Sequence, residues 1–188
     1  MKRRYLLLAG LAAAGGCGRS SNVVAAPAET ADARIGTAVQ IPADSRKSGP
    51  TVTGELLDGS SFDLQSWRGQ VVVVNFWGSW CAPCRLEAAD LQATYEATRE
   101  LGVQFLGVDV RDGRDAAKAF NTSFGITYPS LFDPASRTAL RFADVPPSVI
   151  PATLVLDRGL RVAAVFRKVV TREELETSIR AVAAEQQP

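Results

Sequence analysis

The 188-residue sequence contains no histidine. That absence removes the commonest protein metal ligand and the commonest general base, so whole classes of catalytic mechanism are excluded. Net charge is nearly absent too, because 21 Lys and Arg residues stand against 20 Asp and Glu residues, giving +1. This balance argues against nucleic acid as a partner. Hydrophobic residues make up 46% of the chain and charged residues 22%, as in an ordinary soluble domain.

Cysteine is scarce, with three in the chain: Cys17, Cys81 and Cys84. An odd number in an exported protein requires an explanation for the leftover thiol. Long hydrophobic runs are missing as well, since the apolar stretch at residues 5–14 is too short to cross a bilayer. Preceded by the basic residues 2–4, that stretch has the layout of a secretory signal. We therefore expect an exported protein.

Cys17 directly follows three small residues, and the segment 1–17 resembles a bacterial lipoprotein signal. The resemblance implies cleavage before Cys17 and lipidation of its thiol, which would anchor the protein to the outer face of the cytoplasmic membrane. Ala14 departs from such signals, which usually carry leucine there, so a simple cleaved signal remains open. The paired arginines of the basic start also permit a twin-arginine export signal.

Residues 18–50, rich in small residues and proline, are predicted to form a flexible tether, and residues 51–188 a single domain. The domain is predicted to begin with a hairpin at 51–57 and 60–64, closed by Asp58-Gly59, and a buried strand at 71–76. A helix from Cys84 to about Leu101, ended by Gly102, a strand at 104–110, a helix at 114–124 and a short helix at 138–142 are predicted next. Strands at 153–156 and 161–166 and a helix from the capping box at Thr171 to about Ala184 complete the prediction. This order predicts an α/β fold, with a mixed central sheet flanked by helices and an N-terminal β-hairpin.

The motif Cys81-Ala82-Pro83-Cys84 follows the predicted buried strand and a short turn. A thiol in the first turn of a helix lies near unpaired backbone N–H groups and the positive end of the helix dipole, which favour the thiolate. Cys81 is therefore the candidate nucleophile and should remain partly exposed, while Cys84 would close a redox-active disulfide with it. The alternative is half of a zinc site, but zinc needs four ligands, and the chain has neither histidine nor a second cysteine pair.

Glu87 lies three residues beyond Cys84 and is predicted on the same helical face. An ionised carboxylate there would raise thiol pKa values and accept the proton that Cys84 loses when it attacks. An exposed glutamate favoured by the helix dipole is the alternative. Trp77 and Trp80 flank the motif as candidate apolar contacts for a bound polypeptide, although Trp77 is equally compatible with the core. Four further aromatic residues are expected in the core: Phe62, Trp67, Phe105 and Phe132.

Residues 73–87, Val-Val-Asn-Phe-Trp-Gly-Ser-Trp-Cys-Ala-Pro-Cys-Arg-Leu-Glu, and the downstream Ile150-Pro151-Ala152-Thr153 resemble the extracytoplasmic thioredoxin-like proteins of the TlpA/ResA type. The resemblance covers about residues 51–184 and implies a thioredoxin fold. Cytoplasmic thioredoxins carry a buried acid at the position of Asn75, so the resemblance implies that Glu87 replaces it as proton acceptor.

By the same resemblance, Pro151 is the cis-proline that faces the disulfide. A cis X-Pro bond usually marks a tight, functionally constrained turn. Here it would expose the backbone of Ile150, so that an extended substrate pairs with it as an added strand. A trans proline at a strand start is the alternative, and Pro146 and Pro147 are competing candidates.

The resemblance implies a thiol–disulfide oxidoreductase that reduces disulfides in exported proteins, with apocytochrome c as the substrate class. The absence of histidine between Cys81 and Cys84 also favours a reductase, because groups that stabilise the thiolate make a disulfide more oxidising. A reductase outside the cytoplasm would receive its electrons from a membrane-embedded thiol relay. No cofactor and no metal are expected.

Three other functions remain open. A disulfide oxidase or isomerase would have a reduction potential well above about −200 mV. A thiol peroxidase is disfavoured, because the segment around Cys81 lacks the threonine or serine and the arginine grouping of peroxiredoxins. A copper-binding or redox-sensing module on the same fold would hold its ligand or partner without turnover, but copper carriers of this kind also need histidine.

Overall fold

The computed structural model describes residues 36–142 and 149–185. Six strands form one mixed sheet in the order β1-β8-β7-β4-β5-β6. From edge to edge these strands are β1 (Ala38–Gln40), β8 (Val162–Phe166), β7 (Ala152–Leu156), β4 (Val71–Trp77), β5 (Val103–Val110) and β6 (Ser130–Asp133). β4, β5 and β6 run parallel, whereas the β1–β8, β8–β7 and β7–β4 pairs are antiparallel. The predicted mixed sheet is confirmed.

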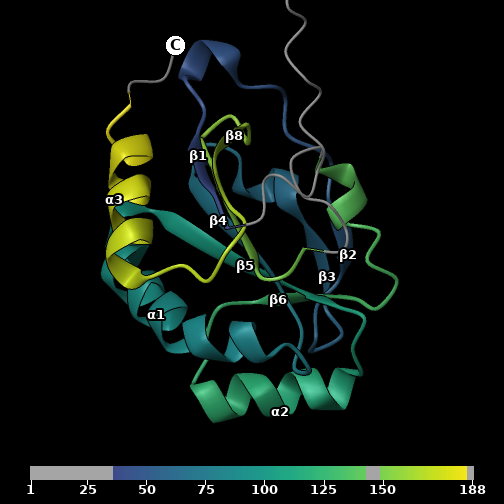
Figure 1. The fold of residues 1–188 in the computed structure, drawn as a ribbon. Coiled ribbons are helices and arrows are strands. Elements are labelled where there is room, and N and C mark those ends of the chain that lie inside the picture. The colour runs from purple at the N-terminus through teal and green to yellow at the C-terminus, as the bar shows by residue number, and fades with distance from the viewer. Residues whose placement is uncertain (1–35, 143–148, 186–188) are drawn as a thin grey trace, which may run out of the picture.

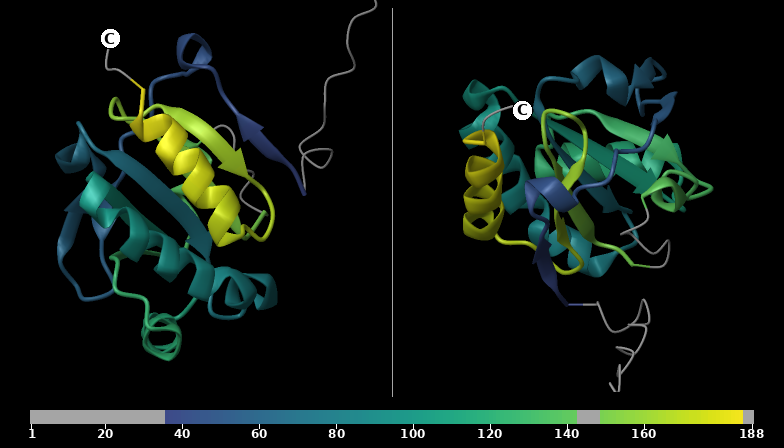
Figure 2. Two further views of the ribbon diagram at one scale, coloured as in Figure 1. Left: turned by 90° about the vertical axis from the view of Figure 1, so that its left-hand side faces the viewer. Right: turned by 90° about the horizontal axis from the view of Figure 1, so that it is seen from above.

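Helices and a hairpin cover the two faces of this sheet (Figure 1). α1 (Ala82–Thr98) and α3 (Arg172–Ala183) lie side by side on one face, which the left view of Figure 2 turns toward the reader. The predicted hairpin forms from β2 (Thr53–Glu55) and β3 (Ser61–Asp63), and it lies on the opposite face of the sheet. α2 (Arg114–Phe124) lies at one end of the sheet and packs beside the first turn of α1.

β4 lies in the interior of the sheet, and all seven of its residues are buried. Its continuous apolar run is the pattern of a strand with both faces covered. Val72, Val74 and Phe76 join the core on the hairpin side, and Val71 and Val73 join the core under α1 and α3. Because neighbours on four sides hold β4, its carboxyl end gives the following loop a fixed starting point.

Local signals decide where the helices begin and end. Gly102 and Gly125 follow the α1 region and α2 with φ of 72° and 64°, a left-handed conformation that glycine adopts without steric cost. α3 opens with the predicted capping box between Thr171 and Glu174. The helix predicted at 138–142 is a single 3₁₀ turn. The 3₁₀ turns are η2 (Ala43–Ser45), η3 (Leu64–Trp67), η4 (Arg99–Leu101) and η5 (Ala139–Arg141).

Two strands occur where the sequence predicted none. β1 falls inside the predicted tether at 18–50, so the tether prediction is wrong for residues 38–40 and the domain begins before residue 51. All three β1 residues are exposed and β1 is held by backbone pairing with β8, so no apolar alternation marks it in the sequence. β6 has four residues, too few for a clear period. The signal segment 1–17, with Cys17, and residues 18–35 lie outside the described residues.

Arg46 fixes the start of the domain to its end. Its guanidinium donates to both carboxylate oxygens of Glu185 at 2.5 and 2.7 Å and to Asp157 at 3.2 Å. It also donates to the carbonyl of Ile41 at 2.9 Å. The side chains of Arg46 and Asp157 are 4% and 7% exposed, whereas that of Glu185 is 37% exposed. The segment after β1 is therefore part of the packed domain.

The aromatic residues predicted in the core reach different depths. Phe105 is fully buried, whereas Phe62, Trp67 and Phe132 are half-buried against core residues.

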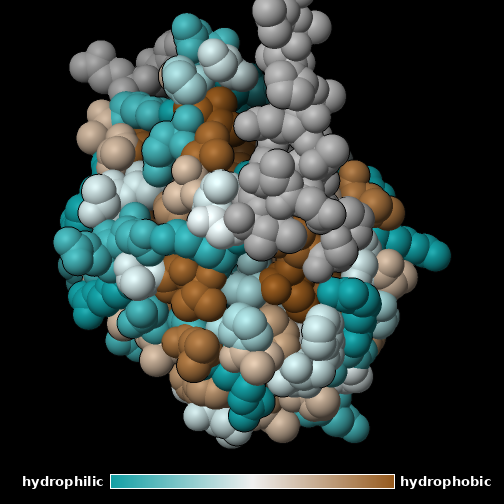
Figure 3. Space-filling model, in the orientation of Figure 1, coloured by the Kyte–Doolittle hydropathy of each residue, from teal (hydrophilic) through white to brown (hydrophobic). Residues whose placement is uncertain are grey.

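Figure 3 shows that apolar surface on one side of the molecule forms separate patches among hydrophilic residues. No helix within residues 36–142 and 149–185 is long and apolar enough to span a membrane.

Replacing Arg46 with methionine should lower the free energy of unfolding by about 2–4 kcal/mol, because partly buried acceptors lose their donor. Urea unfolding measures this change. Arg172→Met is the matched control: Arg172 pairs with Glu176 at 2.6 Å, but its side chain is 52% exposed. That control should change stability by less than about 1 kcal/mol. Equal effects of the two substitutions would contradict a structural role for the segment after β1.

Candidate active site

The Cys81–Cys84 disulfide lies where the chain passes from β4 into α1. The two sulfur atoms are 2.07 Å apart and the two Cα atoms 5.3 Å apart. Cys81 is the N-cap residue of α1, and Cys84 lies in the first turn. Pro83 also lies in that turn, where its missing N–H has no helical partner. The structure thus brings together the two thiols that the motif predicted.

Both cysteines are buried in this oxidised form, with 4% of Cys81 and 2% of Cys84 exposed. The expectation that Cys81 remains partly exposed is wrong here, because it packs in an apolar cluster with Leu57, Trp77 and Phe120. The backbone N–H of Cys84 donates to Cys81 Sγ at 3.2 Å. A helix N–H directed at this sulfur favours the thiolate once the disulfide is opened.

The loop of Gly78, Ser79 and Trp80, here called the active-site loop, brings an aromatic ring beside the disulfide. Trp80 is 51% exposed, and its indole N–H donates to the carbonyl of Val110 at 3.3 Å. Glycine at position 78 leaves room for this ring, since a Cβ there would lie 2.7 Å from Trp80 Nε1 and would displace the ring. The loop therefore holds an apolar surface at the rim of the redox site, available to a polypeptide.

Two residues after β5 hold the active-site loop from the other side. Asp112 accepts a hydrogen bond of 2.6 Å from the backbone N–H of Ser79. The guanidinium carbon of Arg111 lies 4.8 Å from the centre of the Trp80 ring, a cation–π contact. Sequence reasoning missed both residues, because an aspartate and an arginine before a helix look like ordinary turn and N-terminal residues.

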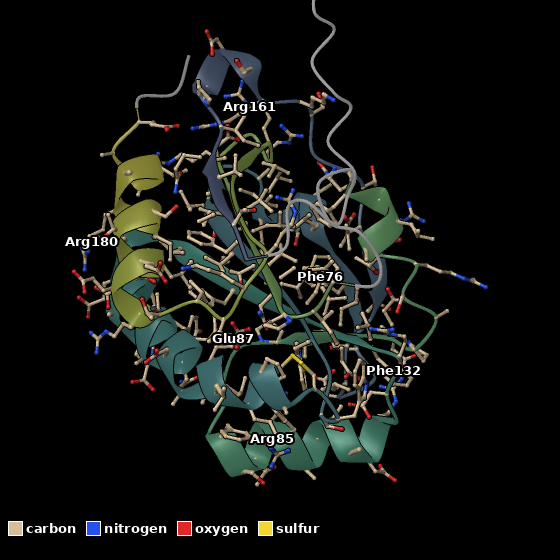
Figure 4. All side chains as sticks on the ribbon, viewed as in Figure 1. Phe76, Arg85, Glu87, Phe132, Arg161 and Arg180 are labelled. Atoms are coloured by element: carbon tan, nitrogen blue, oxygen red, sulfur yellow. A yellow bond between two sulfur atoms is a disulfide. The ribbon has the colours of Figure 1, made fainter. Side chains whose placement is uncertain are left out.

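Trp77 and the α2 face complete the surroundings of the disulfide. Trp77 is 4% exposed, and its ring centre lies 4.5 Å from that of Phe120, so it belongs to the core. The guanidinium carbon of Arg85 lies 5.8 and 5.3 Å from the ring centres of Phe120 and Phe124. Figure 4 shows Arg85 on the α2 side of the disulfide. Leu86 of α1, the residue after Arg85, is 75% exposed.

Glu87 is fully buried, so the alternative of an exposed first-turn glutamate is wrong. Its Oε1 accepts a hydrogen bond of 2.8 Å from Asn75 Nδ2, and its Oε2 accepts one of 3.0 Å from the backbone N–H of Val170. Asn75 also donates to Thr153 Oγ1 at 3.0 Å. In Figure 4 Glu87 lies on the inner side of α1, near the disulfide. The structure therefore joins the two polar residues that the family resemblance connected.

Burial raises the pKa of Glu87 from 4.5 to about 7. The hydrogen bonds from Val170 and Asn75 work in the opposite direction by stabilising the charged form, and the charge of Asp90 adds a further small increase. A carboxyl group with a pKa near neutrality can both take up and release a proton under physiological conditions.

A small cavity of about 10 Å³ adjoins both Cys84 and Asn75, the residue that donates to the Glu87 carboxyl. Cys84 and Asn75 both line it, together with Trp77, Phe120 and Asn121. The cavity therefore adjoins Cys84 and the Asn75 side chain, whose amide donates to the Glu87 carboxyl.

The Ile150–Pro151 peptide bond is cis, as predicted. Pro151 directly precedes β7, whose first residue, Ala152, pairs with Phe76 of β4. Ile150 packs against the apolar cluster that contains both cysteines. The structure therefore brings this turn to the disulfide. Pro146 and Pro147 lie outside the described residues.

Within the described residues, no group of three or more Cys, Asp or Glu side chains is arranged to hold a metal ion. The chemistry available at this site is the making and breaking of a disulfide, with a buried carboxyl group close to the inner sulfur.

Comparison with protein families matches residues 46–165 to the AhpC/TSA family. The thiol-disulfide oxidoreductase ResA of Bacillus subtilis (strain 168) is 31% identical over 130 residues, which cover 69% of each chain. ResA of Geobacillus kaustophilus (strain HTA426) is 29% identical over 126 residues, covering 67% of this chain and 71% of that one.

Solved structures agree with these relatives. A secreted thiol-disulfide isomerase from Corynebacterium glutamicum is 36% identical, with a TM-score of 0.77 over 86% of this chain and 96% of that chain. A DsbF homologue from Corynebacterium diphtheriae is also 36% identical, with a TM-score of 0.74 over 84% of this chain and 96% of that chain. With its disulfide, cis-proline and thioredoxin fold, the chain belongs to the AhpC/TSA family and is a thiol–disulfide oxidoreductase related to ResA.

Proposed function

We propose that the protein reduces disulfides in exported proteins outside the cytoplasm, while a lipid on Cys17 tethers it to the outer face of the cytoplasmic membrane. The observation that carries the proposal is the Cys81–Cys84 disulfide at the N-terminus of α1, beside the half-exposed Trp80 and the cis Ile150–Pro151 turn. The export signal predicted for residues 1–17 and the similarity to a secreted protein from Corynebacterium glutamicum support the location.

The reaction begins from the reduced, dithiol form. The Cys81 thiolate attacks one sulfur of the client disulfide, forms a mixed disulfide and releases the other client sulfur as a thiolate, which takes up a proton. The Cys84 thiol then loses its proton and attacks Cys81 Sγ, which releases the second client thiolate. Two electrons have passed to the client, and the enzyme is left with the disulfide of the present structure.

Glu87 is the proposed acceptor of the Cys84 proton. Its pKa of about 7 suits a group that must accept a proton near neutral pH. Asn75, which donates to the Glu87 carboxyl, lines the same cavity as Cys84, and Glu87 follows Cys84 by three residues in α1. Glu87 is then a proton acceptor for the second step of the exchange.

The proposed direction of electron transfer, from the enzyme to the client, depends on weak stabilisation of the Cys81 thiolate. Ala82 and Pro83 carry no charge, and the surroundings of Cys81 are largely apolar apart from the Cys84 N–H. A poorly stabilised thiolate makes the dithiol a better reductant. Outside the cytoplasm the dithiol must be restored by a donor, for which we propose a membrane-embedded thiol relay. Apocytochrome c is the proposed class of client.

Disulfide isomerisation is the second candidate function. It is favoured by one observation, the 36% identity to the secreted thiol-disulfide isomerase of Corynebacterium glutamicum. An isomerase uses the same first attack by Cys81, but the client resolves the mixed disulfide itself. The two functions therefore differ in reduction potential and in the need for an electron donor.

Replacing Cys84 with alanine should trap clients, because Cys81 still attacks while nothing within the enzyme resolves the mixed disulfide. The full chain is produced in membranes, mixed disulfides are isolated without reductant, and the bound clients are identified by mass. Cys81→Ala is the control and should trap at least about tenfold less, since Cys81 is the N-cap residue whose sulfur accepts a helix N–H that favours the thiolate, and Cys84 is not. Equal recovery with both variants, or none with either, would contradict the proposed nucleophile.

The reduction potential should be more negative than about −200 mV, in the range of reducing thioredoxin-like proteins. Equilibration with glutathione or dithiothreitol buffers measures it. Pro83→His should raise the potential by about 30 mV or more, because an imidazolium beside the sulfurs stabilises the thiolate. A potential well above about −200 mV in the unaltered protein would support the isomerase or an oxidase instead.

Replacing Glu87 with glutamine should remove a pH-dependent loss of stability. The folded protein keeps a proton on Glu87 up to about pH 7, whereas the unfolded chain loses it near 4.5. Stability therefore falls as pH rises through this interval, by at most about 3 kcal/mol. In Glu87→Gln the fall should be smaller by that amount, the remainder coming from Asp109, whose pKa is also raised. The amide of the variant side chain meets two donors and adds a pH-independent cost.

The same variant should resolve mixed disulfides about 100-fold more slowly near neutral pH if Glu87 accepts the Cys84 proton. Stopped-flow mixing with a disulfide peptide separates the first attack, which should change less, from the second. Glu100→Gln is the control, because Glu100 is exposed at the end of the same helical region. An unchanged second step would reject the proposed proton transfer.

A further inference from the structure

Asp109, in β5, is a buried acid that the reaction described above does not use. Asp109 is fully buried and pairs with Trp77, the last residue of β4 before the active-site loop. Among the described residues, no N–H or O–H group donates to either of its carboxyl oxygens. The polar group within hydrogen-bonding contact is the carboxyl of Asp112.

Two carboxyl groups in contact require a proton between them, because two adjacent anions repel each other strongly in a buried environment. Asp112 is the better anion of the two. It accepts hydrogen bonds from the backbone N–H of Ser79 at 2.6 Å and of Gly113 at 2.7 Å. Partial burial works to raise the pKa of Asp112, but the hydrogen bonds from Ser79 and Gly113 outweigh it and lower that pKa.

Asp109 is the partner that keeps the proton. Burial raises its pKa to about 8, the charge and hydrogen bond of Asp112 act in the same direction, Arg114 opposes them, and Asp133 adds a small increase. These three residues are the charged groups that face it, from the segment after β5, from α2 and from β6.

Neither of the other two charged groups replaces Asp112 as a partner. Arg114 is already engaged: its guanidinium donates to the carbonyl of Leu56 at 2.7 Å and to Glu55 at 2.7 Å, over the ring of Phe132. The carboxyl of Asp133 accepts the backbone N–H groups of residues 137 and 138 at 3.0 and 2.6 Å. The hydrogen bond between Asp109 and Asp112 is thus the interaction left to Asp109.

We propose that Asp109 is a positioning residue of the redox site: its protonated carboxyl donates to the Asp112 carboxylate and holds that carboxylate on the Ser79 N–H of the active-site loop. When Asp109 loses this proton to solvent, two anions face each other. Asp112 then moves away, and the loop that carries Trp80 beside the disulfide loses an anchor. The active-site loop is therefore firm at neutral pH and loosens in alkaline conditions.

This inference concerns the positioning of Trp80 and does not depend on the direction of electron flow. It therefore stands or falls separately from the proposed reductase function, which the trapping and potential measurements address. Working with the oxidised protein also removes the two thiols of the site from the titration, so a pH effect on the loop cannot arise from Cys81 or Cys84.

The test follows the Ser79 backbone amide by NMR and hydrogen exchange in the oxidised full chain, in a Glu87→Gln background that removes the neighbouring acid. The Ser79 amide should shift with a midpoint near pH 8, the pKa of Asp109. Asp109→Asn keeps a donor of the same shape at every pH and should abolish the shift. Asp115→Asn, on the exposed first turn of α2, should leave it unchanged.

The hydrogen-exchange rate of the Ser79 amide is measured in the protein that keeps Asp109 and in Asp109→Asn. The ratio of the first rate to the second should rise from about one below the transition to about ten or more above it. The ratio cancels the ordinary base catalysis of exchange. Asp109→Leu, which has no donor, should lack Ser79 protection at all pH values. A transition that persists in Asp109→Asn, or no transition in the unaltered protein between about pH 6 and pH 9.5, would overturn the proposal. If Asp109→Leu does not fold, the comparison of the protein that keeps Asp109 with Asp109→Asn still tests the proposal.

Discussion

The redox site depends on the complete burial of β4. A strand whose seven residues are all buried, and which pairs with β5 and β7, has no freedom to shift its register. Its last residues therefore direct three contacts at once: Asn75 toward Glu87, Trp77 toward Phe120, and the following loop toward Cys81. The apolar run that builds the core also sets the geometry of the chemistry, because the two cysteines lie on a helix that begins just beyond this rigid strand.

Two carboxyl groups are fully buried, Glu87 of α1 and Asp109 of β5, and their hydrogen-bond partners explain why their pKa values differ. Glu87 has two hydrogen-bond donors, which partly offset the cost of burying its charge. Asp109 has none and faces another acid. Its pKa is accordingly raised further from its ordinary value, to about 8 against about 7 for Glu87. Burial of acids without full compensation is costly in a domain core and is characteristic of functional sites.

Short-range patterns were predictable from the sequence, and contacts between distant segments were not. The cysteine pair, the long buried strand and the capping box at Thr171 each depend on neighbours within a few residues, and all were predicted. The edge strand β1 carries no apolar period, because its side chains face solvent. The role of Asp112 depends on Ser79, 33 residues away, and the burial of Cys81 depends on residues from α2; no local pattern encodes either.

The strand register also decides where the chain enters the domain. Ala38 of β1 is level with Phe166, Phe166 with Thr153, and Thr153 with Asn75, which contacts the buried glutamate. The entry point at Gly36 therefore lies at the disulfide end of the sheet, about 15 Å across it in the hydrogen-bonding direction. The chain that precedes Gly36 therefore joins the domain at the end that carries its sulfur atoms, so attachment and chemistry share one end of the sheet and the opposite end is left free of both.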